Sequence, residues 1–517
     1  MAVILVTNAT VFRLLLALVL LSPLPLGSNR PWAWSLFAVA IGLLLLLWCA
    51  LALAGRVRIP VPMSRLWGVA IPFTMVLAWV FLQTLPSVPI DWAHPLWSET
   101  ARALAGPVAA GISASVSPAG IPASISPAGI PASISIDPEL TRTACLRLVS
   151  YGGVFWLAVQ LGRDRSRARQ ALVAIAAAGT AYAIYGMIDH FAGWERLLWL
   201  DKWAYQGDLT ATFVNRNAYG AYAGLGLLCC MGLFLHTLRP SSRTAPPRRA
   251  YYDLAETVLV RAMPFLIGAM IIGTALLLSH SRGAFLCTGL GLLVLMAAAV
   301  ASRLIRPVTA LIIGGLMVGI GLGILGLSGE VTVERLASTP TQAADDARND
   351  LYRLTGDAIA DAPLTGHGFG AFLPAFRMYR DTSLALPVVW DFAHNVHLEA
   401  AMDLGLPAVT LLYLSFAMIL IRCLGGLMRR RRDHIYPAVA LSAATLIGGH
   451  GMVDFSAQMP AVAATLALLL GIGFAQSWRS GDDSRSGLTS DPQPAADGST
   501  GVDPTIPSVV MTIPRRS

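Results

Sequence analysis

The sequence predicts an all-α, polytopic integral membrane protein, and three observations support this fold class. Hydrophobic residues make up 55% of the 517 residues and charged residues only 13%, about half the charged fraction of a soluble protein. Many stretches exceed the roughly 18 apolar residues that indicate a bilayer span. Arginines are also concentrated in alternate loops between these stretches.

Twelve apolar segments are the expected transmembrane helices, and together they form one membrane-embedded domain over residues 1–477. The segments are 11–28, 33–54, 66–86, 144–161, 171–189, 218–238, 262–279, 283–301, 308–328, 404–424, 434–453 and 459–477. All six cysteines lie in or beside these segments. They are therefore expected to be buried thiols, and they imply neither a disulfide framework nor a cysteine zinc site.

The arginine distribution predicts how the chain is oriented. Loops rich in arginine are expected in the cytoplasm, and here they fall on one side if the N-terminus is cytoplasmic. The arginines concerned are Arg56, Arg58, Arg65, Arg163, Arg165, Arg167, Arg169, Arg239, Arg243, Arg248, Arg249, Arg303, Arg306 and Arg429 to Arg432. Both termini are then cytoplasmic, and the loops 87–143, 190–217 and 329–393 are periplasmic. The +8 net charge reflects these cytoplasmic loops and implies no nucleic-acid partner.

The first span and two segments outside the spans have simple interpretations. The first span lacks a clear signal-peptidase site, which favours an uncleaved anchor. Residues 117–134 contain the repeat "SPAGIPASI" twice, and its Pro, Ser and Ala content predicts an extended linker in the outer loop. Residues 478–517 are rich in Ser, Gly, Asp and Pro and are expected to form a disordered cytoplasmic tail.

Ionisable residues are placed at the outer ends of the spans and are rare in their centres. The outer ends hold Asp189, His190, Arg216, His280, Arg282, the segment His394 to Asp403, His450 and Asp454. Ion-coupled transporters tend to place such groups near the bilayer midplane. This pattern therefore favours an active site at the outer membrane surface over a transporter.

The stretch "ATFVNRNAYGAY" places Arg216 between two asparagines just before a span. One interpretation is an arginine that reaches lipid phosphates, with Asn217 capping the helix. The other is a ligand-binding arginine, and the sequence leaves both open.

The stretch "LLLSHSRGAFL" places His280, two serines and Arg282 in a very short outer turn. An arginine outside the membrane runs against the positive-inside preference, so an anionic ligand is a good candidate to compensate its charge. Lys202 is the only lysine in the chain, which makes arginine the default cation. A purely structural Arg282 therefore also remains open.

The stretch "HNVHLEAAMDLGLPAV" carries unusual polarity for the start of a membrane helix. Helical spacing predicts His394 and His397 on one face and Glu399 and Asp403 on another, one turn apart. Asp391 or Asn395 is expected to cap this helix.

The two histidines allow two kinds of chemistry. A His-x-x-His pair is able to hold a metal ion if a third ligand comes from elsewhere. We favour a general base or hydrogen-bond donor at the membrane surface, because a histidine titrates near neutral pH.

Four of these stretches resemble the O-antigen ligase and O-antigen polymerase superfamily of bacterial inner-membrane proteins. They are "TFVNRNAYGAY", "LLSHSRGAFL", "HNVHLEAAMDLGLPAV" and "HGMVDFSAQMPAVAATLALLLGI", and the resemblance covers about residues 144–477. It implies a helical bundle related to the GT-C class with a large periplasmic loop, in the bacterial inner membrane. The repeat at 117–134 is not typical of that family.

The resemblance implies a lipid-linked glycan transferase that needs no metal and no cofactor. Its donor would be a glycan on undecaprenyl diphosphate, and its acceptor the lipid A-core or, in a polymerase, another carrier-linked glycan. The "SRG" and "HN" patterns resemble the ligase branch. Besides these substrates, the expected partners are membrane lipids.

The resemblance also assigns roles to residues. His394 is expected to be catalytic, and Arg216, Arg282 and Arg348 are expected to bind the diphosphate. The residues expected to support them are Asn217, His280, Asn395, His397, Glu399 and Asp454.

Two further functions are weighed against a transferase. A flippase or exporter of lipid-linked glycan would share the outer cations, but it should also show cations along its translocation path, and the span centres lack them. A scaffold for envelope assembly would tolerate substitution of the residues at the outer ends.

Overall fold

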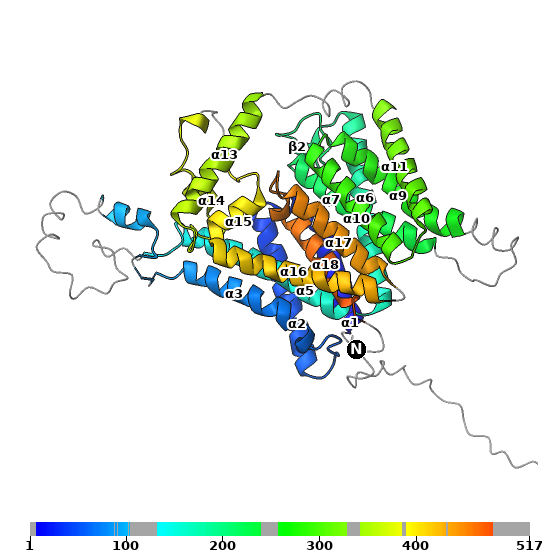
Figure 1. Ribbon diagram of the computed structural model, residues 1–517, viewed down its shortest axis with the longest axis horizontal. Helices are drawn as coiled ribbons and strands as arrows, with labels where there is room; N and C mark the ends of the chain where they lie inside the picture. Colours follow the sequence, from blue (N-terminus) through cyan, green and yellow to red (C-terminus); the bar gives the residue numbers. More distant parts are fainter. Residues whose placement is uncertain are drawn as a thin grey trace, which may run out of the picture. The chain divides into compact units, whose positions relative to one another are not determined.

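The described part of the chain is almost entirely helical. A computed structural model describes residues 7–86, 88–89, 91–101, 103, 132–238, 257–327, 342–384, 389–430 and 433–478 (Figure 1). Its one sheet is a two-stranded antiparallel hairpin of β1 (Arg196–Leu197) and β2 (Leu200–Asp201). The predicted all-α class is confirmed for these residues. Most of the repeat at 117–134 and the tail after Trp478 lie outside them.

Among the described residues, seven helices are long and apolar enough to cross a membrane. They are α2 (Pro31–Leu53), α5 (Pro138–Leu161), α6 (Arg165–Ala192), α7 (Arg216–Thr237), α9 (Met263–Leu278) with the end of η3 (Thr257–Ala262), α10 (Arg282–Ala301) and α16 (Leu406–Arg429). Five shorter apolar helices are α1 (Asn8–Leu21), α3 (Trp67–Gln83), the described part of α11 (Pro307–Leu327), α17 (Ile435–His450) and α18 (Pro460–Ala475). Each predicted span thus overlaps an apolar helix, and seven of these helices are long enough to support a polytopic membrane protein.

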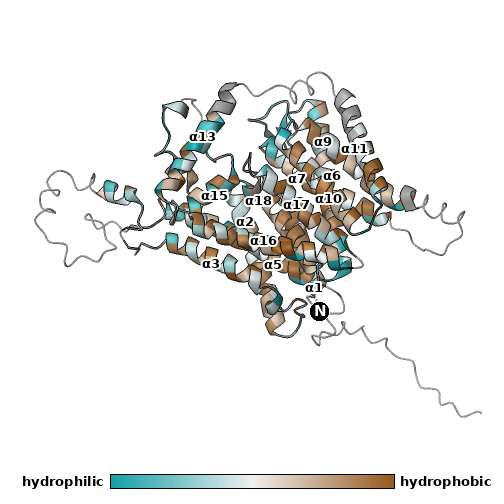
Figure 2. Ribbon diagram, viewed as in Figure 1, coloured by the Kyte–Doolittle hydropathy of each residue, from teal (hydrophilic) through white to brown (hydrophobic). Residues whose placement is uncertain are grey.

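The remaining helices are short or polar. They are η1 (Leu26–Ser28), η2 (Met63–Arg65), α13 (Gln342–Asp361), α14 (Phe372–Phe376), η4 (Thr382–Leu384), α15 (Val396–Leu404) and η5 (Ser456–Gln458). Figure 2 shows hydrophobic residues along α7, α9, α10 and α17, whereas α13 is largely hydrophilic. The polar α13 packs against α15 through a separate small core that includes Leu351, Leu354 and Met402.

Helix α7 is the buried centre of the main bundle. It contacts α6, α9, α10 and α17, and residues Ala218–Leu233 are all buried. Small residues allow this close packing, as in other membrane bundles. A Cβ atom at Gly220 would lie 2.7 Å from the Cβ of Ala284 in α10. The N-terminal end of α7 is therefore held at a fixed position against the start of α10.

Helices α15 and α16 are separated by a break at Gly405. Its backbone has φ 78° and ψ 158°, a conformation that essentially only glycine adopts. A Cβ atom there would also lie 2.5 Å from the carbonyl oxygen of Leu364. The break separates the polar α15 from the apolar α16 and fixes the direction in which α15 leaves the bundle.

We expect Gly405→Ala to destabilise the protein by at least about 1–3 kcal/mol, because backbone strain and the clash with Leu364 add together. Gly425→Ala in α16 is the matched control, since a Cβ there meets nothing within 4 Å and alanine favours a helix. Thermal unfolding of both variants in the same detergent measures the difference. Equal melting temperatures for the two variants would contradict the assignment of strain to Gly405.

Candidate active site

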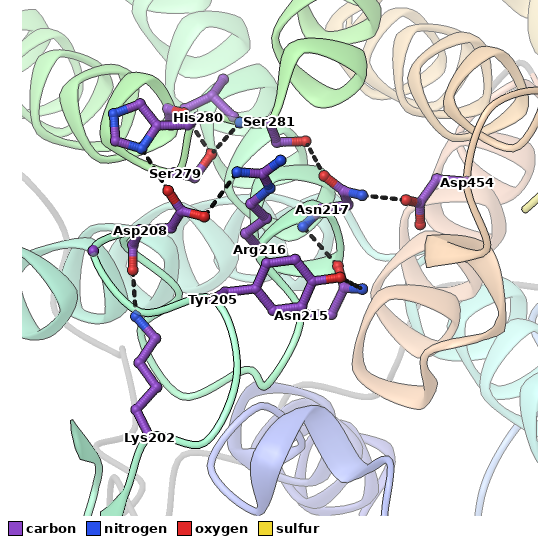
Figure 3. A network of polar contacts seen from close by, with 12 residues as sticks. Lys202, Tyr205, Asp208, Asn215, Arg216, Asn217, Ser279, His280, Ser281 and Asp454 are labelled. Atoms are coloured by element: carbon purple, nitrogen blue, oxygen red, sulfur yellow. Dashed lines mark hydrogen bonds and ion pairs between the residues drawn. The ribbon is translucent and has the colours of Figure 1, made fainter. Parts of the chain in front are cut away.

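The start of α7 is built by a capping asparagine. Asn215 accepts hydrogen bonds at its side-chain oxygen from the backbone N–H groups of Asn217 (2.7 Å) and Ala218 (3.1 Å). The expectation that Asn217 caps this helix is therefore wrong, because α7 begins at Arg216, two residues earlier than a cap at Asn217 requires. Asn217 instead lies in the first turn, and its side chain points out of α7 toward its neighbours (Figure 3).

Asn217 joins three parts of the chain that are far apart in sequence. Its side-chain amide donates to the carboxylate of Asp454, and its oxygen accepts from the Ser281 hydroxyl at 2.8 Å. Asp454 is 2% exposed and also accepts from the backbone N–H of Phe455 at 2.7 Å. The beginning of α7, the α9–α10 turn and the segment after α17 therefore meet at this asparagine.

A second link in the network is Asp208, which the sequence analysis did not single out. Its two carboxylate oxygens accept from Arg216 Nη1 at 2.7 Å and face His280 Nδ1 at 2.8 Å. Its backbone oxygen accepts from the ammonium group of Lys202. The only signal in the sequence is a lone acidic residue eight positions before Arg216.

The electrostatics of Asp208 favour a permanent negative charge. Burial by itself would raise the pKa of this carboxyl, but the hydrogen bond from His280 and the charge of Arg216 outweigh it and hold the pKa below its usual value. The guanidinium of Arg216 also lies over the Tyr205 ring, 5.6 Å from its centre. Arg216 is thereby oriented, with about one third of its side chain still exposed (35%).

The α9–α10 turn has the shape that its sequence predicts. α9 ends at Leu278 and α10 begins at Arg282, with Ser281 capping α10. His280 has a positive φ of 52° in this turn. A Cβ atom at Gly283 would lie 3.1 Å from the His450 ring, so half-buried Arg282 enters α10 beside the end of α17.

His394 lies just outside a helix. α15 begins at Val396, with Asn395 as its cap, and His394 has a positive φ of 51°. The expectation that His394 and His397 share a helical face is therefore wrong, because the chain turns at His394 before the helix starts. The alternative cap, Asp391, is not used.

Backbone contacts on both sides hold His394 in this conformation. Its carbonyl oxygen accepts from the Tyr352 hydroxyl at 3.0 Å, and the N–H of Val396 donates to Gly451 at 2.7 Å. The preceding N–H, that of Ala393, donates to Glu399 Oε2 at 2.8 Å. A non-glycine residue at positive φ persists only where its surroundings impose it, and such residues cluster at functional sites. Tyr352 is a second residue that the sequence analysis missed.

The imidazole of His394 lies among aromatic rings and opposite charges. Its centre is 5.1 Å from the Phe455 ring and 6.0 Å from the Trp390 ring. Burial lowers its pKa, the negative charge of Asp454 raises it, and the positive charge of Arg348 lowers it. Asp454 therefore acts electrostatically on His394 while it binds Asn217, and this connects the histidine to the network around Arg216.

Glu399 and Asp403 lie one turn apart in α15, as predicted, and both are buried. Burial raises the pKa of Glu399 to about 7, and it raises the pKa of Asp403 well above its usual value. Glu399 also accepts from the Gln458 amide at 2.8 Å, and Asp403 accepts from the Gly370 N–H at 2.7 Å. Through these hydrogen bonds, the two carboxyl groups attach α15 to the segments that contain Gln458 and Gly370.

His397 faces the transmembrane helices. Its Nδ1 lies 2.6 Å from the Tyr413 hydroxyl and its Nε2 lies 2.9 Å from the Gly448 carbonyl oxygen. A carbonyl only accepts, so Nε2 carries the proton and Nδ1 accepts from the tyrosine. Both ring nitrogens of His397 are engaged, and the His-x-x-His pair does not present two unoccupied nitrogens to a metal ion.

The structure thus brings most of the predicted site residues into one polar region. Arg216, Asn217, His280 and Asp454 belong to the network described above, and the charge of Asp454 links His394 to it. Arg348 joins them through its charge and lies on the exposed side of α13. Glu399, Asn395 and His397 surround His394 and hold α15 in place.

Residues 267–413 match the family model described as O-antigen ligase. The matched segment runs from α9 into α16, so it contains His280, Arg282, Arg348 and His394. Arg216, Asn217 and Asp454 lie outside it. Asn217 contacts the segment at Ser281, and Asp208, which binds Arg216, contacts it at His280. The comparison with curated proteins finds no match.

Proposed function

Since the O-antigen ligase segment at residues 267–413 makes the chain a member of the O-antigen ligase superfamily, we propose that it transfers a glycan from undecaprenyl diphosphate to an acceptor sugar. The acceptor is the lipid A-core, and the reaction takes place at the periplasmic face of the bacterial inner membrane. The termini are cytoplasmic, and the transfer needs no metal ion.

The observation that carries this proposal is that Asp454 links the imidazole of His394 to the start of α7, where Arg216 lies. Asp454 binds Asn217 beside Arg216 and acts on the charge of His394. A base and a phosphate-binding group are the two elements that glycosyl transfer from a diphosphate requires. They come here from segments more than 170 residues apart in the chain.

The charge and shape of the arginine side chains suit them to bind the diphosphate leaving group. Negative charge grows on the diphosphate as its bond to the anomeric carbon breaks. Guanidinium groups bind phosphate oxygens in a two-pronged arrangement and stay charged at any relevant pH. Arg216, Arg282 and Arg348 would therefore stabilise the departing diphosphate, with Asp208 keeping Arg216 oriented.

His394 is suited to activate the acceptor. Its lowered pKa keeps the imidazole neutral at neutral pH, so it is ready to take the proton of the attacking hydroxyl. The proton moves to His394 as the new bond to the anomeric carbon forms, and the diphosphate leaves with the electron pair of the broken bond. Asp454 stabilises the imidazolium that results.

The pH dependence of transfer should respond to the charges beside His394. A base must be unprotonated, so kcat/KM should rise with pH and level off, with its midpoint below the usual histidine value of about 6.5 because burial lowers the pKa. Arg348→Gln removes a charge that lowers this pKa, so the midpoint should move up. Asp391→Asn removes one that raises it, so the midpoint should move down. Shifts in the same direction for both variants would contradict the assignment of the titration to His394.

Reporter fusions test the proposed orientation. Fusions after Arg163 and Arg306 should read cytoplasmic, because the loops that contain these two residues are rich in arginine. A fusion after Trp199 should read periplasmic. Alkaline phosphatase and green fluorescent protein fusions report the two sides independently. A periplasmic signal after Arg306 would place the site on the wrong side of the membrane for this donor.

The glycan profile of a deletion strain tests the choice of acceptor. Loss of a ligase leaves unmodified lipid A-core together with carrier-linked polymer. Loss of a polymerase leaves core capped with a single repeat unit, and this outcome would replace the lipid A-core with a second carrier-linked glycan as the acceptor. An unchanged surface glycan in a clean deletion would count against both.

A further inference from the structure

A pocket of about 640 Å³ lies between the turn that joins α1 to α2 and the β1–β2 hairpin. The α1–α2 side contributes Leu26, Arg30 and Trp32, and the hairpin side contributes Leu198, Trp199 and Trp203. None of these six residues belongs to the polar network around Asp454. The volume falls within the range of pockets that hold a small ligand.

The lining is apolar except for one cation. Leucine, proline and tryptophan form the walls, and Arg30 is the only ionisable residue among those that line the pocket. Its guanidinium lies over the Trp203 ring, 5.2 Å from the ring centre. No acidic side chain of the lining competes for this charge, so the pocket is complementary to an apolar chain that carries one negative group.

The tryptophans suggest where the pocket meets its ligand. Trp32, Trp199 and Trp203 are 58%, 79% and 50% exposed, far more than buried core residues. Trp32 lies in the first turn of α2, at the end of a helix that is long and apolar enough to span a membrane. Exposed tryptophans at such a position are typical of the boundary between lipid headgroups and acyl chains.

We propose that this pocket binds an anionic glycerophospholipid of the surrounding membrane. Part of an acyl chain occupies the leucine and tryptophan walls, and the phosphodiester is bound by Arg30. One guanidinium matches the single negative charge of a phosphodiester, whereas the doubly charged diphosphate of a carrier lipid suits the several arginines of the proposed active site. This inference does not depend on the reaction that the protein catalyses.

The two turns that line the pocket have a constrained backbone conformation. Leu26 and Leu198, one on each side, have positive φ values of 57° and 62°, which leucine adopts only under constraint. The turn at Gly27 packs on Phe213, since a Cβ atom there would lie 2.6 Å from that ring. Phe213 belongs to the segment that leads to Arg216, so a lipid in the pocket would support the start of α7.

Photocrosslinking tests the proposal directly. The purified full-length protein is reconstituted into phosphatidylcholine nanodiscs with a trace of phosphatidylglycerol that carries a photoreactive acyl chain. We expect crosslinks at residues 24–32 and 197–203, and a yield at least fivefold above that of the matching photoreactive phosphatidylcholine. Equal yields for the two lipids at these residues would overturn the role of Arg30, and crosslinks only elsewhere would overturn the site.

Variants separate charge from folding. Arg30→Gln should lower the phosphatidylglycerol yield about five- to tenfold, to the level of phosphatidylcholine, while Arg30→Lys should retain most of the preference. Arg196→Gln is the matched control, because Arg196 lies on the same hairpin, paired across from Asp201 and outside the pocket lining. An equal loss in Arg30→Gln and Arg196→Gln would overturn the proposal.

Competition identifies the source of the lipid. Unlabelled phosphatidylglycerol should reduce the crosslink at 197–203, whereas an equal amount of a polyprenyl diphosphate should reduce it no more than phosphatidylcholine does. Stronger competition by the polyprenyl diphosphate would assign the pocket to the carrier lipid and contradict an anionic glycerophospholipid.

Discussion

His394→Ala should reduce glycan transfer by at least about 10³-fold while binding of the lipid-diphosphate donor persists. A positioned general base contributes roughly 10²–10⁴-fold to a rate, and alanine removes it without touching the arginines that hold the diphosphate. Single-turnover transfer measures the first quantity, and retention of labelled donor on the purified variant measures the second.

The matched control is His397→Ala, three residues further along the chain. His397 uses both ring nitrogens to bind Tyr413 and Gly448, so its loss should lower stability more than the rate of the chemical step. We expect its single-turnover rate to stay within about tenfold of wild type once the folded fraction is taken into account. Full transfer by His394→Ala, or a greater loss in His397→Ala, would remove His394 from the role of base.

Arg282→Ala should lower the rate of glycan transfer about 10³-fold, and Arg282→Lys should lower it by nearly as much. Arginines that stabilise a transferring phosphoryl group are worth roughly 10³–10⁵ in rate, and a lysine cannot reproduce their planar two-pronged contact. The position supports this role, because Arg282 follows directly on Ser281, which bonds to Asn217 next to Arg216. Both variants should also bind the donor more weakly.

Arg306→Ala provides a control for Arg282. Arg306 is an exposed arginine beyond the other end of α10, before α11, and its loss should leave the rate within about twofold, as for most surface substitutions. Transfer rates near wild type for both Arg282→Ala and Arg282→Lys would leave Arg282 with a structural role only.

The positions of the helices could be predicted from the sequence because burial in a bilayer demands long apolar stretches. The α9–α10 turn illustrates this, since a gap of four polar residues between two apolar runs leaves room only for a tight turn. Likewise Glu399 and Asp403 lie one turn apart because they are four positions apart in the sequence. These features follow from local spacing alone.

The contacts of the site could not be predicted because they depend on long-range packing. Asp208 is an isolated acid in a polar loop, and its partner His280 follows 72 residues later. Asn217 was expected to cap α7 because it is an asparagine near the predicted helix start. Asn215 is the cap instead, and the side chain of Asn217 binds Asp454. Local sequence carries no signal for such a choice.

The backbone conformation of His394 also could not be predicted from the spacing of residues in the sequence. A helical pattern starting at His394 fits the sequence, yet the hydrogen bonds from Ala393 to Glu399 and from Tyr352 to the His394 carbonyl hold the residue at positive φ before α15 begins. Tertiary contacts override the local pattern there.

The most direct test of the central claim is a single turnover by the purified protein in the presence of EDTA. The reaction contains an undecaprenyl-diphosphate-linked glycan and a lipid A-core acceptor. We expect wild type to convert up to one equivalent of donor into glycan linked to the acceptor, and His394→Ala to convert none on the same timescale. Absence of product with folded wild-type protein that binds donor, or activity that EDTA abolishes and zinc restores, would contradict a metal-independent transfer at His394.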